Sequence, residues 1–228
     1  MLSAIAIVPS APVMVPDLAS GAAAELAELR DAVLTAAASL PDRWIAIGVG
    51  QNDVVVGHER VGTFGGYGVD VRITLSPEPA EEPAQMPLCA LIAGWIRGQA
   101  KPEARAEVRV YATDHDVDAA VARGRRLRAE IDEAGNPVGV LVVADGANTL
   151  TPSAPGGYDP DSIAMQAALD DVLAAGDAAA LTRLPHTIVG RVAYQVLAGL
   201  AEPGPRAAEE LYRGAPYGVG YFAGVWQP

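Results

Sequence analysis

The stretch PVGVLVVAD, residues 137–145, decides the fold of this chain. Every residue from 138 to 144 is apolar or glycine, with no alternation between polar and apolar positions. An unbroken apolar run of this length is typical of a strand that is buried on both faces, and such strands belong to parallel sheets covered by helices. The stretch therefore predicts an inner strand of a covered, parallel sheet.

Strand-like and helix-like segments alternate along the rest of the chain. Two more apolar runs predict buried strands over residues 4–8 and 44–50, and AEVRVYA, residues 106–112, predicts a third core strand. Apolar side chains at helical spacing predict helices over residues 17–40, 86–98, 117–135, 162–177 and 187–202. This alternation indicates the α/β class. We expect one domain, residues 1–228, with a mostly parallel central sheet and helices on both of its faces.

Some segments carry finer expectations. Residues 53–57 and 68–75 predict two strands on either side of the glycine-rich turn GTFGGYG, residues 62–68. Asp17 or Ser20 is expected to cap the helix over residues 17–40. The helix over residues 162–177 is expected to bury one face, made of Ile163, Leu169, Val172 and Leu173. The aromatic tail, residues 215–226, fits either a core strand or the interface of a homo-oligomer through Tyr217, Tyr221, Phe222 and Trp226.

Composition excludes several classes of partner. With 28 acidic and 16 basic residues the formal net charge is −12, which argues against a nucleic-acid-binding surface. The first residues lack a basic segment and are interrupted by Pro9, Pro12 and Pro16, so no signal peptide, membrane span or membrane partner is expected. The single Cys89 lies in an apolar run and is interpreted as a buried hydrophobic residue. We expect a cytoplasmic protein.

Polar side chains cluster where the expected strands end. In an open α/β sheet, ligands bind beyond the carboxyl ends of the strands, so the turns there predict a cleft for a small-molecule ligand. The candidate residues are Ser10, Gln51, Asn52, Asp53, Asp114, His115, Asp145 and Asn148, with Tyr158 in the loop that follows. His115 is the strongest candidate for a metal ligand or base, but the aspartates beside it favour the cap and first turn of a helix instead.

Three segments resemble the class III extradiol ring-cleavage dioxygenase family, whose LigB-like fold also includes the Memo proteins. AIVPSAPVMVPDL, residues 6–18, is similar to the family's opening strand and its PHPP turn. Residues 142–177, which contain DGANTLTP and a Tyr-Asp-Pro turn, are similar to the family's GDLSHRLTP segment. APYGVGYFAGV, residues 215–225, is similar to the closing strand and its PFGVGY motif.

The resemblance implies a mononuclear non-haem iron, held by two histidines and a carboxylate, with a further histidine as acid and base. This chain departs from that pattern at the ligand positions. Ser10, Gly50 or Gln51, and Asn148 stand where the family has histidines; Ala164 to Gln166 stand where it has an acid; and Glu81 or Glu82 stands near another histidine position. Because serine, glycine and asparagine are poor ligands for Fe(II), we expect no metal and no cofactor.

Three functional interpretations follow. The first is a LigB-like protein that has lost the iron site and binds a small molecule or serves in assembly. The second is a divergent enzyme, with a metal at His115 and nearby acids, or with metal-free hydrolysis that uses Ser10, His115 and Asp145 without a nucleophile-elbow motif. The third and weakest is an active dioxygenase, because the three histidines match no family motif. We favour the binding protein over an enzyme. The polar groups of the cleft distinguish the two: in a binding protein they are hydrogen-bonded to the backbone, whereas in an enzyme they converge on one space.

Overall fold

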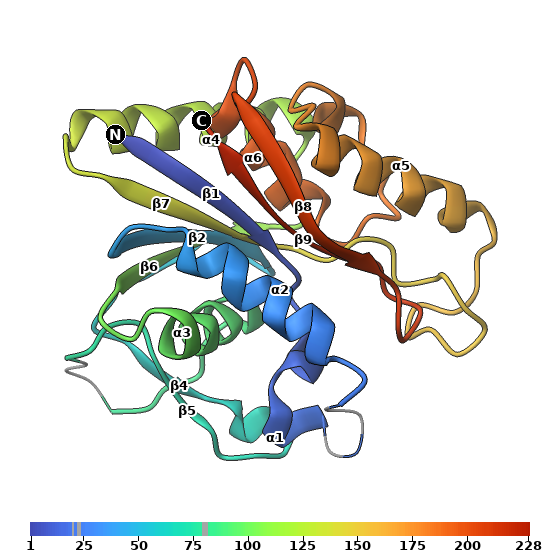
Figure 1. The fold of residues 1–228 in the computed structure, drawn as a ribbon, viewed down its shortest axis with the longest axis horizontal. Coiled ribbons are helices and arrows are strands. Elements are labelled where there is room, and N and C mark those ends of the chain that lie inside the picture. Colours follow the sequence, from blue (N-terminus) through green and yellow to red (C-terminus); the bar gives the residue numbers. More distant parts are fainter. Residues whose placement is uncertain (20, 22–23, 79–81) are drawn as a thin grey trace.

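The computed structural model describes residues 1–19, 21, 24–78 and 82–228. These residues form a seven-stranded central sheet and a separate two-stranded sheet (Figure 1). The central strands are β1 (Leu2–Val8), β2 (Arg43–Gly50), β3 (Val54–Val56), β6 (Arg105–Ala112), β7 (Val138–Val143), β8 (Ala207–Gly214) and β9 (Tyr221–Gln227). Their order across the sheet is β3-β6-β2-β7-β1-β9-β8.

Four parallel strands form the middle of the central sheet. β6, β2, β7 and β1 all run in the same direction, so the four core strands expected from the sequence form the parallel part of the sheet. The flanking strands are antiparallel: β3 pairs with β6 at one edge, and β9 and β8 continue from β1 at the other. The α/β class is thus confirmed, with a mixed sheet whose parallel part lies at its centre.

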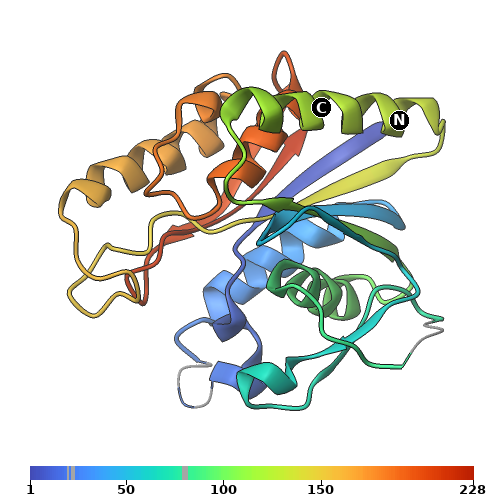
Figure 2. The same ribbon diagram turned by 180° about the vertical axis from the view of Figure 1, so that it is seen from behind.

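Helices pack on both faces of the central sheet (Figures 1 and 2). On one face lie α2 (Ala27–Ala38) and α3 (Leu88–Ala100), together with the small sheet of β4 (Val61–Thr63) and β5 (Arg72–Thr74). On the other lie α4 (Val117–Glu133), α5 (Asp161–Ala175) and α6 (Arg191–Ala201). The remaining short helices are α1 (Pro16–Ala19), η1 (Pro12–Met14), η3 (Phe64–Tyr67) and η4 (Ala180–Arg183).

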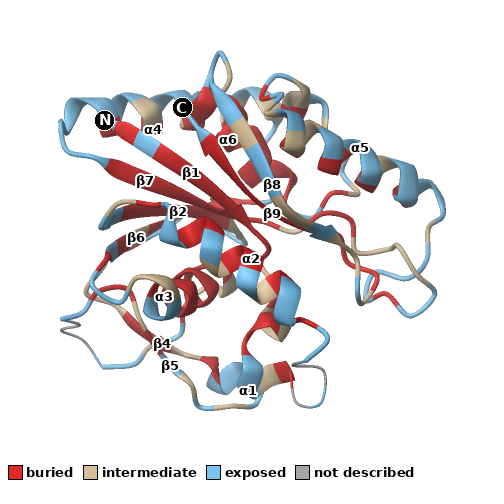
Figure 3. Cartoon of the chain, in the orientation of Figure 1, coloured by how far each residue is buried: buried red, intermediate tan, exposed pale blue. Residues whose placement is uncertain are grey.

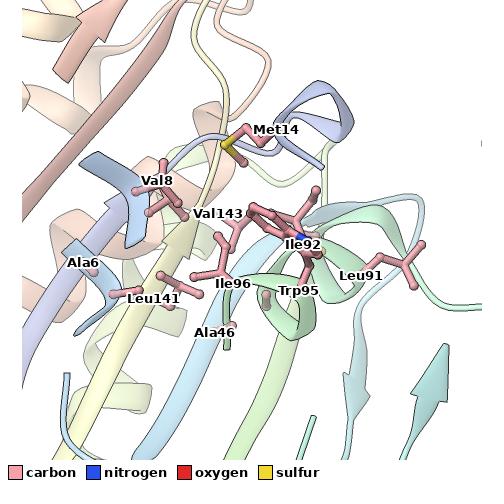
Figure 4. Close-up of a cluster of buried hydrophobic side chains, with 14 of the residues drawn as sticks. Ala6, Val8, Met14, Ala46, Leu91, Ile92, Trp95, Ile96, Leu141 and Val143 are labelled. Atoms are coloured by element: carbon pink, nitrogen blue, oxygen red, sulfur yellow. The ribbon is translucent and has the colours of Figure 1, made fainter. Parts of the chain in front are cut away.

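Successive residues of the inner strands enter different cores. In β7, Leu141 and Val143 pack on the side of α2 and α3, and Val140 and Val142 pack on the side of α4 and α6. Figure 4 shows Leu141 and Val143 close to Ile96 and its neighbours on α3, and the inner strands are buried along most of their length (Figure 3). Two apolar layers therefore explain why β7 lacks an alternating pattern.

Several elements differ from their sequence-based expectations. The helix expected over residues 17–40 is divided into α1 and α2. Asp17 lies in the first turn of α1 rather than at its cap, and Ser20 lies outside the described residues. The expected hairpin around residues 62–68 does form, but from β4 and β5; β3 pairs with β6 instead.

The C-terminal part holds two further corrections, at Ile163 and at β8, and it confirms the core-strand alternative for the aromatic tail. Ile163 is 51% exposed rather than on the buried face of α5. The tail forms β9, in which Tyr221, Phe222 and Trp226 are buried, so these rings fill the core and are not available for an interface. Strand β8 was not expected, because its charged edge sequence AAEELYRG has no clear alternation. Cys89 is buried, as expected, and among the described residues no helix is long and apolar enough to cross a membrane.

Candidate functional site

The turns that follow β1 and β7 meet through Asp145. The backbone amide of Ser10 donates a hydrogen bond of 2.8 Å to Asp145 Oδ1. Surrounding atoms bury the carboxyl group, and this burial raises the pKa of Asp145 to about 7, although the Ser10 hydrogen bond opposes the rise. Asp145 therefore keeps its proton up to neutral pH, unlike an ordinary aspartate.

The start of α6 holds this turn in place. Gly190 donates its backbone N–H to the carbonyl oxygen of Asp145 at 2.9 Å, and the Tyr194 hydroxyl donates to the carbonyl oxygen of Ala144 at 2.9 Å. A Cβ atom at Gly190 would lie 2.7 Å from the Asp145 carbonyl oxygen, so only glycine permits this approach. Burial, with the Asp145 charge, raises the pKa of Tyr194 well above its usual range.

A second buried carboxyl is linked to the same loop by Gln166 of α5. Gln166 Oε1 accepts a 2.8 Å hydrogen bond from the Ala147 amide, and Nε2 donates one of 2.8 Å to Asp170 Oδ1. The Gln166 side chain lies where Cβ atoms of Gly146 and Gly220 would be, so both glycines are needed to admit it. Burial raises the pKa of Asp170 to about 6, and the Gln166 hydrogen bond and the Arg213 charge oppose this only in part.

Asp53 and His115 form a separate cluster at the ends of β2 and β6. Asp53 Oδ1 accepts from the Ala112 amide at 2.8 Å and lies 2.6 Å from His115 Nε2, while Oδ2 accepts from Arg123 Nη2 at 2.8 Å. Burial acts to raise the pKa of Asp53, but these hydrogen bonds outweigh it and lower the pKa to about 2. The carboxylate is thus fully engaged by its neighbours.

The His115 turn is held from its other side by Arg191, the first residue of α6. The buried Arg191 side chain donates to the carbonyl oxygens of Thr113 at 3.3 Å and His115 at 3.2 Å. Asp116 caps α4 by accepting from the Ala119 amide at 2.7 Å, which confirms the capping interpretation of the acidic turn. The turn has a structural role, and α6 joins it to the Asp145 turn.

The structure does not gather the remaining candidates with these groups. Gln51 and Asn52 are exposed, and Tyr158 is 52% exposed on the loop before α5. Asn148 is partly buried and closes that loop, its carbonyl oxygen accepting from the Gly156 amide at 2.9 Å. The structure brings four of the other candidates into two hydrogen-bonded clusters, one in which Ser10 meets Asp145 and one in which Asp53 meets His115.

Three hollows lie around these clusters. Asp53 lines one against α4, and His115 lines another, together with His186 and Arg191. The third, which we call the α5–β8 pocket, has a volume of about 440 Å³. Its walls include Leu150, Ile163, Gln166, Ala167, Asp170 and Arg213. It has the size and mixed apolar and polar lining of a small-molecule site.

Sequence reasoning did not predict this pocket, and it named none of the lining residues as cleft candidates. Gln166 and Asp170 are four residues apart on α5, a spacing that brings side chains together on a helix and could have revealed the pair. Arg213 lies on the unexpected strand β8, where it pairs with Asp171 at 2.8 Å and with Glu210. Within residues 1–19, 21, 24–78 and 82–228, no three His, Cys, Asp or Glu side chains gather as a metal site; Glu81 falls outside these ranges, while Glu82 falls within them.

The Asp53 cluster leads to a stability prediction. Replacement of Asp53 by Asn should lower the free energy of unfolding at pH 7 by about 1 kcal/mol, a small effect because solvent screens the 43% exposed side chain. The pKa of Asp53 is depressed in the folded state, so its contribution is present above pH 4 and is lost as the pH falls toward 2. Urea denaturation of both proteins between pH 2 and pH 7 measures this; a difference that persists unchanged at pH 2 would contradict it.

Comparisons with known proteins show that this chain shares its fold with a solved structure. No family model matches the chain, and no curated protein sequence is significantly similar to it. Among solved structures, the chain is similar to the crystal structure of the uncharacterized protein JW3007 from Escherichia coli K12, with a TM-score of 0.64 and 9% sequence identity. The match covers 98% of this chain and 99% of the other. At this identity the comparison shows a shared α/β fold and nothing about activity.

Proposed function

We propose that this chain is a LigB-like protein that has lost the Fe(II) site and the ring-cleaving activity, and that it binds a small organic molecule. The resemblance of its strand-end turns to that family is the basis for the first part. The second part rests on the α5–β8 pocket. The proposal gives both features one explanation: a family scaffold that is kept for binding after its metal ligands have been exchanged.

The residues at the implied ligand positions do not fit Fe(II). Ser10 offers only a neutral hydroxyl oxygen, a poor ligand for Fe(II) compared with imidazole. Asn148 is a weak ligand compared with imidazole. His115 is bonded to Asp53 beyond the end of β6, two strands away from β7. We therefore derive no reaction step through a metal.

The observation that carries the proposal is the position of Gln166. It stands in the segment where the family has an acidic ligand, and both of its polar atoms are already bonded, to the Ala147 amide and to Asp170. The same side chain forms part of the wall of the α5–β8 pocket. A glutamine in this place binds the protein's own loop rather than a metal, and forms a polar wall next to an apolar space.

The lining of the pocket defines the ligand class. Ile163 and Leu150 offer apolar contact, and Ile163 exposes 51% of its surface although it is a large apolar residue. Asp170 supplies a carboxyl oxygen at the buried side. A largely apolar, uncharged molecule with one N–H or O–H donor matches these groups.

Binding of N-phenyl-1-naphthylamine, an uncharged aromatic dye with one N–H, tests the pocket. Its fluorescence should rise to saturation with the wild-type protein. Ala167→Trp places a large ring in the pocket and should weaken the affinity at least about tenfold. Ala168→Trp is the matched control, since Ala168 is an equally exposed alanine on α5 that does not line the pocket. Equal affinities in the two variants would contradict the pocket assignment.

Metal content tests the loss of the iron site separately. Untagged protein should be purified anaerobically from cells supplied with iron and zinc, beside His115→Ala, and measured by inductively coupled plasma mass spectrometry. We expect far less than one metal ion per chain in both samples, and, when Fe(II) and a catechol are added, no oxygen uptake beyond that of the same mixture without protein. Stoichiometric metal that disappears in His115→Ala would overturn the proposal and assign a metal site to the turn after β6.

A divergent enzyme is the second candidate, and one observation favours it. Asp145 has a pKa of about 7 at the carboxyl end of a central strand, where a general acid or base would be effective. In that case Asp145→Asn would abolish turnover of the substrate. The pairing of Asp53 with His115 argues for the binding function, because these two side chains bond to each other rather than to a ligand.

A further inference from the structure

A groove lies between the sheet edge at β3 and helix α4, separate from the α5–β8 pocket. Its volume is about 550 Å³, and its lining includes Val55, Tyr111 and Leu127. The groove exists because β3 has only three residues and leaves the outer part of β6 uncovered on the α4 side. No residue that lines the α5–β8 pocket lines this groove.

The strand register places an apolar floor on the α4 side of the sheet. Val55 is opposite Arg109 in the antiparallel pair, so both side chains leave the same face of the sheet. Arg109 reaches Glu130 of α4 at 3.4 Å, which identifies that face. Tyr111, two residues further along β6, belongs to the same face, and Val55 keeps 54% of its surface exposed. An exposed valine and a tyrosine ring therefore lie beside each other at this edge.

Three arginines line the groove, and they differ in whether they are paired with a carboxylate. Arg109 is paired with Glu107 and Glu130, and Arg123 is bonded to Asp53. Among the contacts of the described residues, Arg126 forms no hydrogen bond or ion pair, although it lines the groove from α4. The Tyr111 hydroxyl likewise has no hydrogen-bond partner there, and it lies close enough to Arg109 and Arg123 for their charges to act on it. Two unused donors, Arg126 and the Tyr111 hydroxyl, thus line a groove whose other walls are partly apolar and partly made of paired charges, with Asp53 and Glu130 among them.

We propose that the α4–β3 groove binds a small organic anion, an apolar body bearing one carboxylate, sulfonate or phosphate group. The anionic group binds the Arg126 guanidinium and accepts from the Tyr111 hydroxyl, and the apolar body covers Val55 and Leu127. Inorganic anions lack the apolar contact that must offset repulsion by a chain with a net charge of −12. The site is independent of the function proposed above, since it shares no residue with the α5–β8 pocket.

The probe is 8-anilinonaphthalene-1-sulfonate, which is N-phenyl-1-naphthylamine with a sulfonate added. Fluorescence titration should be performed on the Ala167→Trp background, in which the α5–β8 pocket is filled, so that the signal belongs to the groove. We expect saturable binding to one site per chain, with the sulfonate dye bound more tightly than the uncharged dye. Absence of saturable sulfonate-dye binding on this background would overturn the groove while leaving the α5–β8 pocket untouched.

Two arginine variants locate the site. Arg126→Gln should weaken sulfonate-dye binding about tenfold, the size of one charge-assisted hydrogen bond. Arg125→Gln is the matched control, because it removes a charge from the residue just before Arg126 on α4, and Arg125 is paired with Glu202 outside the groove. This variant should change the affinity for the sulfonate dye less than about twofold. Tyr111→Phe should weaken binding about threefold without affecting the uncharged dye. Equal losses in Arg126→Gln and Arg125→Gln would mean a general charge effect and would overturn the proposal.

Discussion

Replacement of Gly199 by alanine is expected to lower the free energy of unfolding by about 2–3 kcal/mol. Helices α4 and α6 cross with their backbones in contact, and a Cβ atom at Gly199 would overlap the carbonyl oxygen of Val121. The facing Gly124 is under the same restriction, since its Cβ would lie 2.7 Å from the Leu200 nitrogen. Backbone atoms cannot rotate away as a side chain can, so the helices must separate and the core between them loosens. Urea denaturation followed by circular dichroism measures the loss.

Gly98 provides the matched control for this crossing. It lies in α3, and a Cβ atom there would meet no other atom within 4 Å. Gly98→Ala should leave stability unchanged or raise it by up to about 1 kcal/mol, as expected for an exposed helical glycine. The double variant Gly124→Ala/Gly199→Ala should cost less than the sum of the single changes, because one separation of the helices relieves both overlaps. Equal stabilities of Gly98→Ala and Gly199→Ala would show that the helices do not make this close contact.

Asp145→Asn should become progressively more stable than the wild type as the pH rises. The pKa of Asp145 is raised in the folded state to about 7, so folding favours the protonated form. Between the unfolded pKa, near 4, and the folded pKa the folded protein binds more protons, and its stability falls with rising pH. Asparagine has the same shape, keeps an oxygen for the Ser10 amide and never ionises. The stability advantage of the variant should grow by about 2–3 kcal/mol between pH 5 and pH 8. Nearly all of this growth falls in the two pH units between pH 5 and the folded pKa of about 7, and the difference levels off above that pKa.

Urea denaturation at pH 5, 6, 7 and 8 tests this expectation, with Asp114→Asn as control. Asp114 is an exposed carboxylate in the turn after β6, and its replacement should leave the pH dependence as it is in the wild type. If the curves of Asp145→Asn and wild type stay parallel over this range, Asp145 is ionised in the folded protein. That result would also remove the argument for Asp145 as an acid or base in an enzyme.

Part of the fold follows from the sequence because of short-range periodicity. β7 is apolar or glycine throughout and β1 and β2 are apolar along most of their length, and a run of that kind lies between two apolar layers. β6 keeps the valines, alanines and tyrosine of a core strand around its two charged inner residues, Glu107 and Arg109. The helices α3, α4 and α5 follow from apolar spacing and from residues that end a helix, such as Gly135, which follows α4 with a positive φ of 70°. Asp116 could be identified as a cap because capping depends on residues three positions apart.

The site depends on contacts that no local pattern encodes. Asp53 meets His115 because β3 turns back to pair with β6, and Gln166 meets the Ala147 amide because α5 packs beside the loop after β7. The sequence determined which segments become the inner strands and the long helices, since that choice is made by each segment's own hydrophobic pattern; the charged edge strand β8 has no such pattern. The tertiary structure alone decided the order of the strands in the sheet, and with it which polar groups neutralise one another and which remain open to a ligand. Strand order is set by packing across the whole chain, so residues 62 positions apart become partners without any sign in the sequence around them.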